Sequence, residues 1–181
     1  MRSAHGDEGV MSVTETARLR LREMRDDDAS FILEVLTDPD FIANVGDRGV
    51  HDLSAARRYI ADGPGSSYAK YGFGLYLVEL LADRAPLGIC GLLRRDSHPD
   101  VEIGFAFVPR ARGHGYALEA ARATLAYAQS TLGLTRVVAL TAPDNRPSIR
   151  ILESIGLRFE RMVRFTPDAG ERRLFVFERR P

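Results

Sequence analysis

The sequence predicts a single α/β domain built on a mixed, mostly antiparallel twisted sheet, with a central parallel strand pair and flanking helices. Its length of 181 residues lies in the usual range for one domain, and no repeat or linker-like block divides it. Several short alternating segments are joined by turns, which is typical of antiparallel strands. Over 101–141 the pattern is strand, helix, strand, and this crossover implies that the two strands pair in parallel.

The first elements are predicted from alternation and from helix start signals. The alternating leucines and arginines of Ala17–Arg22 indicate a half-buried strand. The aspartates Asp26–Asp28 favour the start of a helix, which ends at Asp38-Pro39. Residues 1–13 mix charge, glycine and serine, so we expect a flexible N-terminal segment followed by one domain over 14–181.

The later elements follow from the same signals. A Gly-Pro-Gly loop is expected after a helix over Leu53–Ile60, a turn near Ala82–Ala85 joins two strands, and Gly133 is placed to end the longest helix. The remaining ranges are strands at Phe73–Leu81, Pro86–Leu93, Val101–Val108 and Arg136–Thr141, helices at Tyr116–Leu132 and Arg146–Ile155, and strands at Leu157–Phe165 and Glu171–Phe177.

Composition excludes several classes of protein. The 25 basic residues cancel the 25 acidic ones, so no global positive field would hold the chain on a nucleic acid. The single cysteine, Cys90, lies in an apolar strand, where it is expected to be a small core residue. No apolar run approaches the ~18 residues of a membrane span, so we expect a soluble, cytoplasmic protein.

The most informative segment is the loop Val108–Ala117, which ends a strand and opens the long helix. The first turn of a helix leaves N–H groups unpaired and carries roughly half a positive charge, so an anion can dock there. Gly113 and Gly115 permit a close approach to the backbone, and a phosphate would balance the charges of Arg110 and Arg112. The alternative is a tight turn with two solvated arginines. The residues that a P-loop or a dinucleotide fingerprint needs are absent.

The strand before this loop has unequal faces. Bulky apolar side chains alternate with Glu102, Gly104, Ala106 and Val108, so an extended ligand has room on the second face. Glu102 is the only ionisable group on that face, which makes it a candidate general base. The alternative is a water-exposed carboxylate at the end of a strand.

A third polar group begins the last predicted helix. Asn145, Ser148 and Leu152 share one helical face, so the two polar side chains either cap the helix or face a cleft. His114, in the glycine loop, has no partner at metal-ligand spacing, so no metal site is expected.

These residues resemble a known family, the Gcn5-related N-acetyltransferases, which carry an Arg/Gln-x-x-Gly-x-Gly/Ala loop between strand and helix. The matching residues are Arg110-Ala-Arg-Gly113-His-Gly115. Val101-Glu-Ile-Gly-Phe, and Asn145-x-x-Ser148 leading to Ile155-Gly156-Leu157, look like the branch that contains the ribosomal-protein N-terminal acetyltransferases. The order and spacing of the elements match from about Thr14 to the end.

The resemblance implies acetyl-coenzyme A as the acetyl donor and an amine as the acceptor. The amides of 112–117 would hold the pyrophosphate, a strand edge would pair with the pantetheine amides, and Asn145 would touch the same arm. Glu102 matches the position of a base that takes a proton from the amine. The implied donor-binding residues are Phe107, Val108, Arg110, Arg112, Gly113, His114, Gly115, Tyr116, Ala117 and Asn145.

The implied reaction is direct attack of a neutral amine on the thioester in a ternary complex. A backbone N–H of the central strand stabilises the oxyanion, and coenzyme A leaves as a thiolate. An amine of pKa ~8 to 10 is mostly protonated at neutral pH, so a carboxylate such as Glu102 is needed to free its lone pair. Many family members carry a tyrosine acid where this sequence has Leu152, so Ser148 or a water would protonate the thiolate.

Several acceptors are compatible with the sequence. The acceptor site is expected at Phe41–Asp52 and at the turn Thr166–Gly170, and Asp38, Asp40 and Asp47 offer charge for a cationic amine. Protein N-termini, polyamines, amino acids and aminoglycoside-like molecules all remain open, as do a monomer and a homodimer. Two alternatives to an enzyme are a non-catalytic module that senses acyl-coenzyme A and a domain that works through protein contacts.

Overall fold

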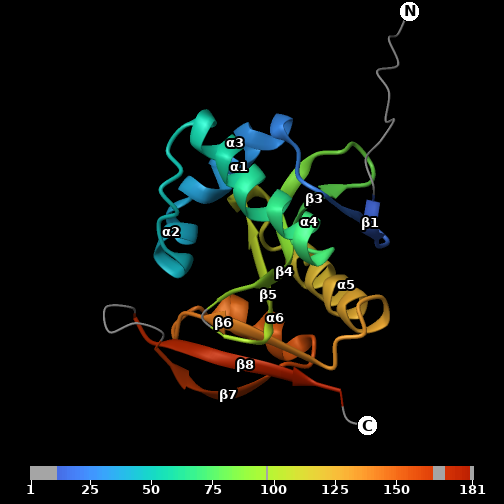
Figure 1. The fold of residues 1–181 in the computed structure, drawn as a ribbon, viewed down its shortest axis with the longest axis vertical. Helices are drawn as coiled ribbons and strands as arrows, with labels where there is room; N and C mark the ends of the chain where they lie inside the picture. The colour runs from blue at the N-terminus through green and yellow to red at the C-terminus, as the bar shows by residue number, and fades with distance from the viewer. Residues whose placement is uncertain (1–11, 97, 165–169, 180–181) are drawn as a thin grey trace, which may run out of the picture.

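The computed structural model describes residues 12–96, 98–164 and 170–179. These residues form one eight-stranded sheet of order β1-β2-β3-β4-β5-β6-β8-β7, in which β5 and β6 pair in parallel (Figure 1). The predicted single-domain α/β class with a mixed, mostly antiparallel sheet is confirmed. The strands are β1 Ser12–Glu15, β2 Leu19–Arg22, β3 Leu75–Leu80, β4 Pro86–Arg94, β5 Val101–Phe107, β6 Arg136–Thr141, β7 Arg158–Val163 and β8 Arg172–Glu178.

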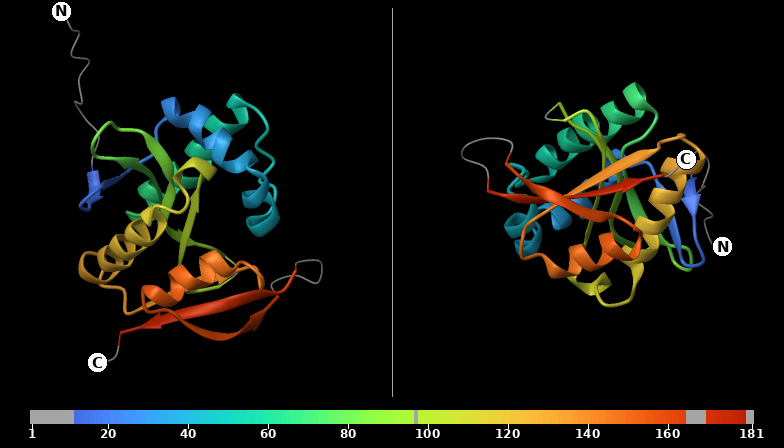
Figure 2. Two further views of the ribbon diagram at one scale, coloured as in Figure 1. Left: turned by 180° about the vertical axis from the view of Figure 1, so that it is seen from behind. Right: turned by 90° about the horizontal axis from the view of Figure 1, so that it is seen from below.

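Helices cover both faces of the sheet. α3 and α4 lie on the side turned to the viewer in Figure 1, whereas α5 and α6 lie on the side seen in the left view of Figure 2. No helix within the described ranges is long and apolar enough to span a membrane. The helices are α1 Ala29–Thr37, α2 Pro39–Val45, α3 Leu53–Ile60, α4 Ser66–Tyr71, α5 Tyr116–Ser130 and α6 Arg146–Ser154, with 3-10 turns at Asp26–Asp28 and Pro109–Ala111.

Helix α2 was not predicted from the sequence, because the dipeptide that ends α1 also begins α2. Asp38-Pro39 ends α1 at Thr37 as predicted, but it also begins α2. The Asp38 carboxylate accepts from the N–H groups of Asp40 and Phe41, each at 3.1 Å. Proline suits the first position of a helix, since that position needs no N–H donor.

The prediction of a Gly-Pro-Gly loop after α3 is wrong. Residues Ala61–Gly65 form a π-helical segment that runs from α3 into α4 without a break. Pro64 is buried in this segment, and a single π turn changes the hydrogen-bond pattern enough to accept a residue that lacks an N–H. The continuous unit carries Tyr59 and Tyr71 to a cleft beside β5.

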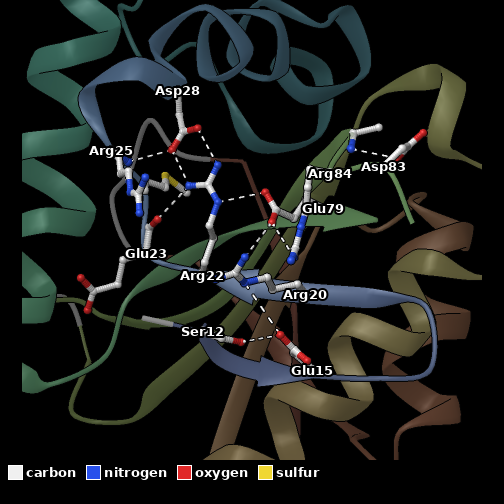
Figure 3. A network of polar contacts seen from close by, with 12 residues as sticks. Ser12, Glu15, Arg20, Arg22, Glu23, Arg25, Asp28, Glu79, Asp83 and Arg84 are labelled. Carbon is white, nitrogen blue, oxygen red and sulfur yellow. Dashed lines mark hydrogen bonds and ion pairs between the residues drawn. The ribbon is translucent and has the colours of Figure 1, made fainter. Parts of the chain in front are cut away.

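Buried charges fasten the N-terminal strands to the sheet (Figure 3). β1 begins at Ser12, within the segment 1–13 that was expected to be flexible, and residues 1–11 lie outside the described chain. Glu79 on β3 is 4% exposed and accepts from Arg22 Nε at 2.9 Å. Arg22 also donates two 2.8 Å hydrogen bonds to Asp28, which are the main reason that the pKa of Arg22 lies above its ordinary value.

The sheet opens between β5 and β6. β4 and β5 pair through seven residues each, whereas the parallel pairing of β5 with β6 is a single pair, Glu102 with Val138. The predicted strand–helix–strand crossover is confirmed, and Gly133 follows α5 with a φ of +67° as a helix terminator should. Because the parallel contact is so short, β5 and β6 diverge beyond it.

Candidate active site

A cleft of about 460 Å³ lies beside the diverging strands β5 and β6. Glu102, Gly104 and Ala106 of the face predicted to be bare line it, and Ile103 and Phe105 of the bulky face line it as well. Asn145 and Ser148 at the start of α6 line the same space. Residues of α2, of the α3–α4 unit and of the end of β4 complete the lining. A cavity of this size with a few convergent polar groups suits a small-molecule ligand.

The glycine loop after β5 has the backbone geometry of an anion site. Gly113 and Gly115 have φ angles of +81° and +80°, a left-handed conformation that side chains disfavour. Gly115 is the N-cap of α5 and supplies no side-chain cap. The N–H groups at the start of α5, from Tyr116 and Ala117 onward, are therefore left for an acceptor outside the helix.

The two arginines of this loop are paired within the chain, which corrects the expectation that a phosphate balances them. Arg110 pairs with Glu34 on α1, and Arg112 pairs with Asp38 at 2.7 Å and also with Asp40. The partners lie 72 to 76 residues away in sequence, beyond any local pattern. Both arginines fasten the loop to α1 and α2.

Fewer main-chain groups of β5 point to its open edge than the sequence implied. The Val108 N–H donates to the Leu87 carbonyl at 3.1 Å, so it is paired on the β4 side. Main-chain groups of an antiparallel strand alternate between its two neighbours, so those of Phe105 and Phe107 point to the β6 side. Both residues lie beyond the single pair with β6, and the Phe107 carbonyl accepts from Arg112 Nε at 2.9 Å. The N–H groups of Phe105 and Phe107 are the donors that this edge offers to a ligand.

Asn145 and Ser148 serve both the helix and the cleft. The Asn145 side-chain oxygen accepts from the Ser148 N–H at 3.2 Å and so caps α6. Both residues, together with Leu152, also line the cleft. The two interpretations of this helical face, capping and ligand contact, are therefore compatible.

Glu102 is buried and has a counterion. The residue is 5% exposed, which excludes the alternative of a water-exposed carboxylate. Arg95 Nε lies 2.6 Å from Glu102 Oε2, and His98 Nε2 lies 3.6 Å from the same oxygen. Since an isolated carboxylate is costly to bury, Arg95 makes this position tenable.

Among the cleft residues missed from sequence are Arg95, Tyr59 and Tyr71. A signal for Arg95 was available, because pairing of the strands over 86–93 and 101–108 brings the residues after the first strand close to Glu102. The tyrosines reach the cleft through packing of the α3–α4 unit, which no local pattern signals. Burial raises the pKa of Tyr59 although the charges of Arg48 and Arg95 act against the rise, so its hydroxyl stays protonated at neutral pH.

The expected acceptor region contributes in part. From the predicted range 41–52, the cleft lining takes Phe41, Asn44, Val45 and Arg48. The three aspartates expected to attract an amine are not in the lining, since Asp38 and Asp40 bind Arg112 and Asp47 lies 3.3 Å from His51. Of the predicted turn 166–170, residues 166–169 lie outside the described chain.

Two further side chains, His114 and Cys90, contact neighbouring side chains of the fold. The His114 ring stacks on Tyr116 with centroids 5.5 Å apart, and the part of the chain that the structure describes holds no group of three or more potential metal-ligating side chains. Cys90 is 0% exposed, and its Sγ lies 3.3 Å from Thr124 Oγ1. The prediction that Cys90 is a core residue is confirmed.

Comparison with known proteins identifies the family. A model of the acetyltransferase (GNAT) domain matches residues 18–158. The chain belongs to this family, the Gcn5-related N-acetyltransferases, as its loop and helix motifs indicated.

Individual relatives agree with this assignment. The chain is 33% identical over 152 residues to the protein YkkB of Bacillus subtilis (strain 168), a match that covers 82% of this chain and 87% of YkkB. An acetyltransferase of the GNAT family from Bacillus anthracis has a similar structure, with a TM-score of 0.76 at 25% identity over 91% of this chain and 96% of that one. RimL, a ribosomal L7/L12 alpha-N-protein acetyltransferase solved with coenzyme A, shares the fold with a TM-score of 0.76 at 12% identity, over 93% and 98% of the two chains.

Proposed function

We propose that the protein transfers an acetyl group from acetyl-coenzyme A to a primary amine, on a small molecule or a protein N-terminus. The observation that carries the proposal is the position of Glu102 and the glycine loop at opposite ends of β5. From Glu102 to Phe107 an extended strand spans ~17 Å, comparable to the reach of an extended pantetheine arm. A donor with its diphosphate at the loop would thus bring its thioester to the buried carboxylate.

The donor would be held mainly by main-chain groups. The amides from Gly113 to Ala117 would bind the pyrophosphate, since the Arg112 N–H already donates to the Pro109 carbonyl at 3.2 Å. The N–H groups of Phe105 and Phe107 would pair with the pantetheine arm. Asn145 lines the cleft where the arm would pass. When bound, acetyl-coenzyme A supplies the thioester that the amine attacks.

The acyl transfer would need one base and, at most, a weak acid. Glu102 would take the proton of the acceptor amine, directly or through a water, and a backbone N–H of β5 would stabilise the oxyanion. Ser148 lines the cleft and would protonate the departing thiolate. A thiol of pKa ~8.5 is a good leaving group, so replacing a tyrosine by Leu152 is compatible with catalysis.

The branch of the family and the location in the cell are part of the same proposal. The motifs at Val101 and Asn145 favour the branch that contains the ribosomal-protein N-terminal acetyltransferases. Solved structures with such names share the fold with this chain at 17% identity or less, which supports the fold alone. A cytoplasmic location follows from the composition, with its single cysteine.

A sensor that binds acyl-coenzyme A without turnover is the second candidate. The ion pair of Arg95 with Glu102 favours it, because a carboxylate oxygen that already accepts from a guanidinium at 2.6 Å must share or give up that hydrogen bond to take a proton. In an enzyme, the bound amine would have to compete with Arg95 for the carboxylate.

Glu102→Gln separates the two candidates. An enzyme should retain donor binding, measured by titration calorimetry, while release of free thiol with an amine acceptor falls ~100-fold or more. Glu153→Gln, an exposed carboxylate of α6 outside the cleft, serves as the control and should leave both unchanged. A wild type that binds the donor but releases no thiol with any acceptor would support the sensor. If acetyl-coenzyme A at ~100 times its dissociation constant did not raise the free energy of unfolding by the expected ~2.7 kcal/mol, both candidate functions would be excluded.

A further inference from the structure

The acceptor side of the cleft has a basic character that the sequence did not reveal. Among the described residues, the basic side chains of the lining are Arg48, Lys70, Arg94 and Arg95, and the acidic ones are Asp62, Asp96 and Glu102. Because Glu102 is matched by Arg95, three basic side chains face two acidic ones in the remainder. A cationic polyamine would therefore meet an excess of positive charge in this part of the lining.

Two of these cations line the cleft together with one phenolic hydroxyl. Arg48, from the loop after α2, and Arg95, from the end of β4, share this lining with Tyr59 of α3, and their charges act against the rise in the pKa of that tyrosine. Arg48 is exposed and has no hydrogen bond or ion pair with any other described residue. A free guanidinium, a second guanidinium and a phenolic O–H make a donor set suited to a carboxylate.

The position of this donor set relative to the proposed base limits the size of the acceptor. Arg95 Nε is 2.6 Å from the Glu102 carboxylate, so the anion-binding group and the base are in direct contact. An acceptor that uses both must carry its amine within a few bonds of its carboxylate, as an α-amino acid does. A protein N-terminus has a neutral peptide carbonyl at that place and would leave Arg48 without an anionic partner.

We propose that the acceptor is a small amino acid, whose carboxylate is held by Arg48 and Arg95 beside Tyr59 while its amine lies at Glu102. The inference rests on the proposed acetyl transfer and names its substrate class. In the reaction, the amine nitrogen forms the bond to the acetyl carbon, the thioester C–S bond breaks, Glu102 receives the amine proton and coenzyme A departs with the electron pair of the broken bond. Arg48 and Tyr59 are specificity-determining residues that touch the carboxylate.

The test compares each amino acid with its own amide. The two share an amine and a side chain, but the amide is neutral, and its less basic amine is more fully deprotonated at neutral pH. A preference of the wild type for the acid would therefore run against intrinsic reactivity. We expect kcat/KM for the acid to exceed that for the amide by about tenfold to a hundredfold, the usual effect of charge-assisted hydrogen bonds. α-, β- and γ-amino acids, a dipeptide and spermidine complete the panel.

Arg48→Gln is the decisive variant. It should raise KM for the acid about tenfold or more with little change in kcat, and it should leave the amide unaffected. Arg58→Gln is the matched control, because Arg58 lies on α3 outside the cleft lining and bonds Ser54. Tyr59→Phe should reduce the preference for the acid by a smaller factor. An equal loss with both substrates in Arg48→Gln would overturn the inference, as would a wild type that prefers the amide, the dipeptide or spermidine.

Calorimetry distinguishes failure of this inference from failure of the proposed function. Acetylation of polyamines or peptides without acids would leave the acetyltransferase standing and refute the amino-acid acceptor. Binding of amino acids to the wild type and not to Arg48→Gln, without thiol release from any acceptor, would leave the anion site standing and refute the transfer. Absence of both binding and release would refute both.

Discussion

At the residue scale, the Glu102 carboxylate depends on Arg95 for its place in the cleft. A buried carboxylate without a counterion is strongly unfavourable, and a guanidinium at 2.6 Å offsets much of that cost. The same ion pair joins the proposed base to the proposed carboxylate site, because Arg95 and Tyr59 line the same cleft. A single arginine after β4 thus connects the two ends of an acceptor.

Gly113→Ala is expected to weaken donor binding and to destabilise the fold by ~1–2 kcal/mol, because the left-handed backbone at φ +81° disfavours a side chain. A Cβ there would meet nothing within 4 Å, so strain rather than a clash is the cause. Gly133→Ala is the matched control, with φ +67° and open space at the far end of α5. It should lose similar stability in urea unfolding and bind the donor normally. Equal weakening of donor binding in both variants would contradict a specific role for the loop.

Glu119 gives the stability a pH dependence that can be isolated. Burial would raise the pKa of Glu119, but hydrogen bonds from Thr16 and Arg18 outweigh it and hold the pKa below its ordinary value. A depressed pKa contributes stability above the unfolded pKa of ~4.3 and loses it as pH falls through the folded value. The difference in unfolding free energy between wild type and Glu119→Gln should therefore be largest near neutral pH and shrink below about pH 4. A difference that stays constant from pH 7 to about pH 3 would refute this assignment.

At the element scale, α2 is held at both ends by arginines from distant strands and loops. Its cap Asp38 accepts from Arg112, and the Asn44 carbonyl near its C-terminal end accepts from Arg172 of β8 at 2.6 Å. Because Phe41 and Asn44 line the cleft, these contacts set one wall of the cleft. Seven residues of helix are too few to be stable alone, so tertiary contacts maintain α2.

Arg112→Gln is expected to cost ~1–3 kcal/mol, because it leaves the Asp38 carboxylate, only 9% exposed, without its charged partner. Hydrogen exchange should show faster opening of α2. Arg110→Gln is the matched comparison, since the Arg110–Glu34 pair is about half exposed on both sides. An exposed pair contributes at most ~1 kcal/mol, so this variant should leave α2 protected. Equal effects of the two substitutions would show that Arg112 does not hold α2.

At the scale of the whole molecule, the sheet consists of two parts joined at its centre. β1 to β5 form an antiparallel block, β6 to β8 form another, and the parallel pair of Glu102 with Val138 links them. α5 connects the two blocks along the chain, between β5 and β6, and packs on β4 and β5 of the first block. The cleft therefore lies at the joint between the two blocks, where β5 and β6 diverge beyond their single pair.

The rate at which the Cys90 thiol is labelled shows whether the folded domain opens by global unfolding or locally. It is the single cysteine, it is 0% exposed, and burial raises its pKa to about 12, so the native thiol should be unreactive. Labelling by a thiol reagent should require global unfolding, and acetyl-coenzyme A at ~100 times its dissociation constant should slow it ~100-fold. Labelling that is fast in the native state, or that ignores a bound donor, would mean that the sheet opens locally at β4.

The sequence by itself determined most of the strands and helices, though not β1, α2 or α4, together with the glycine loop before α5 and the cap at Asn145. These features depend on periodicity and turn chemistry, which act over a few residues. It also singled out Glu102, since an acidic residue on a bare strand face is a local contrast. Only the tertiary structure decided which charges meet, because Arg110 and Arg112 find partners 72 to 76 residues away through the packing of α1 and α2. Packing likewise turned a predicted loop into the α3–α4 unit and brought Tyr59 and Arg48 to the cleft.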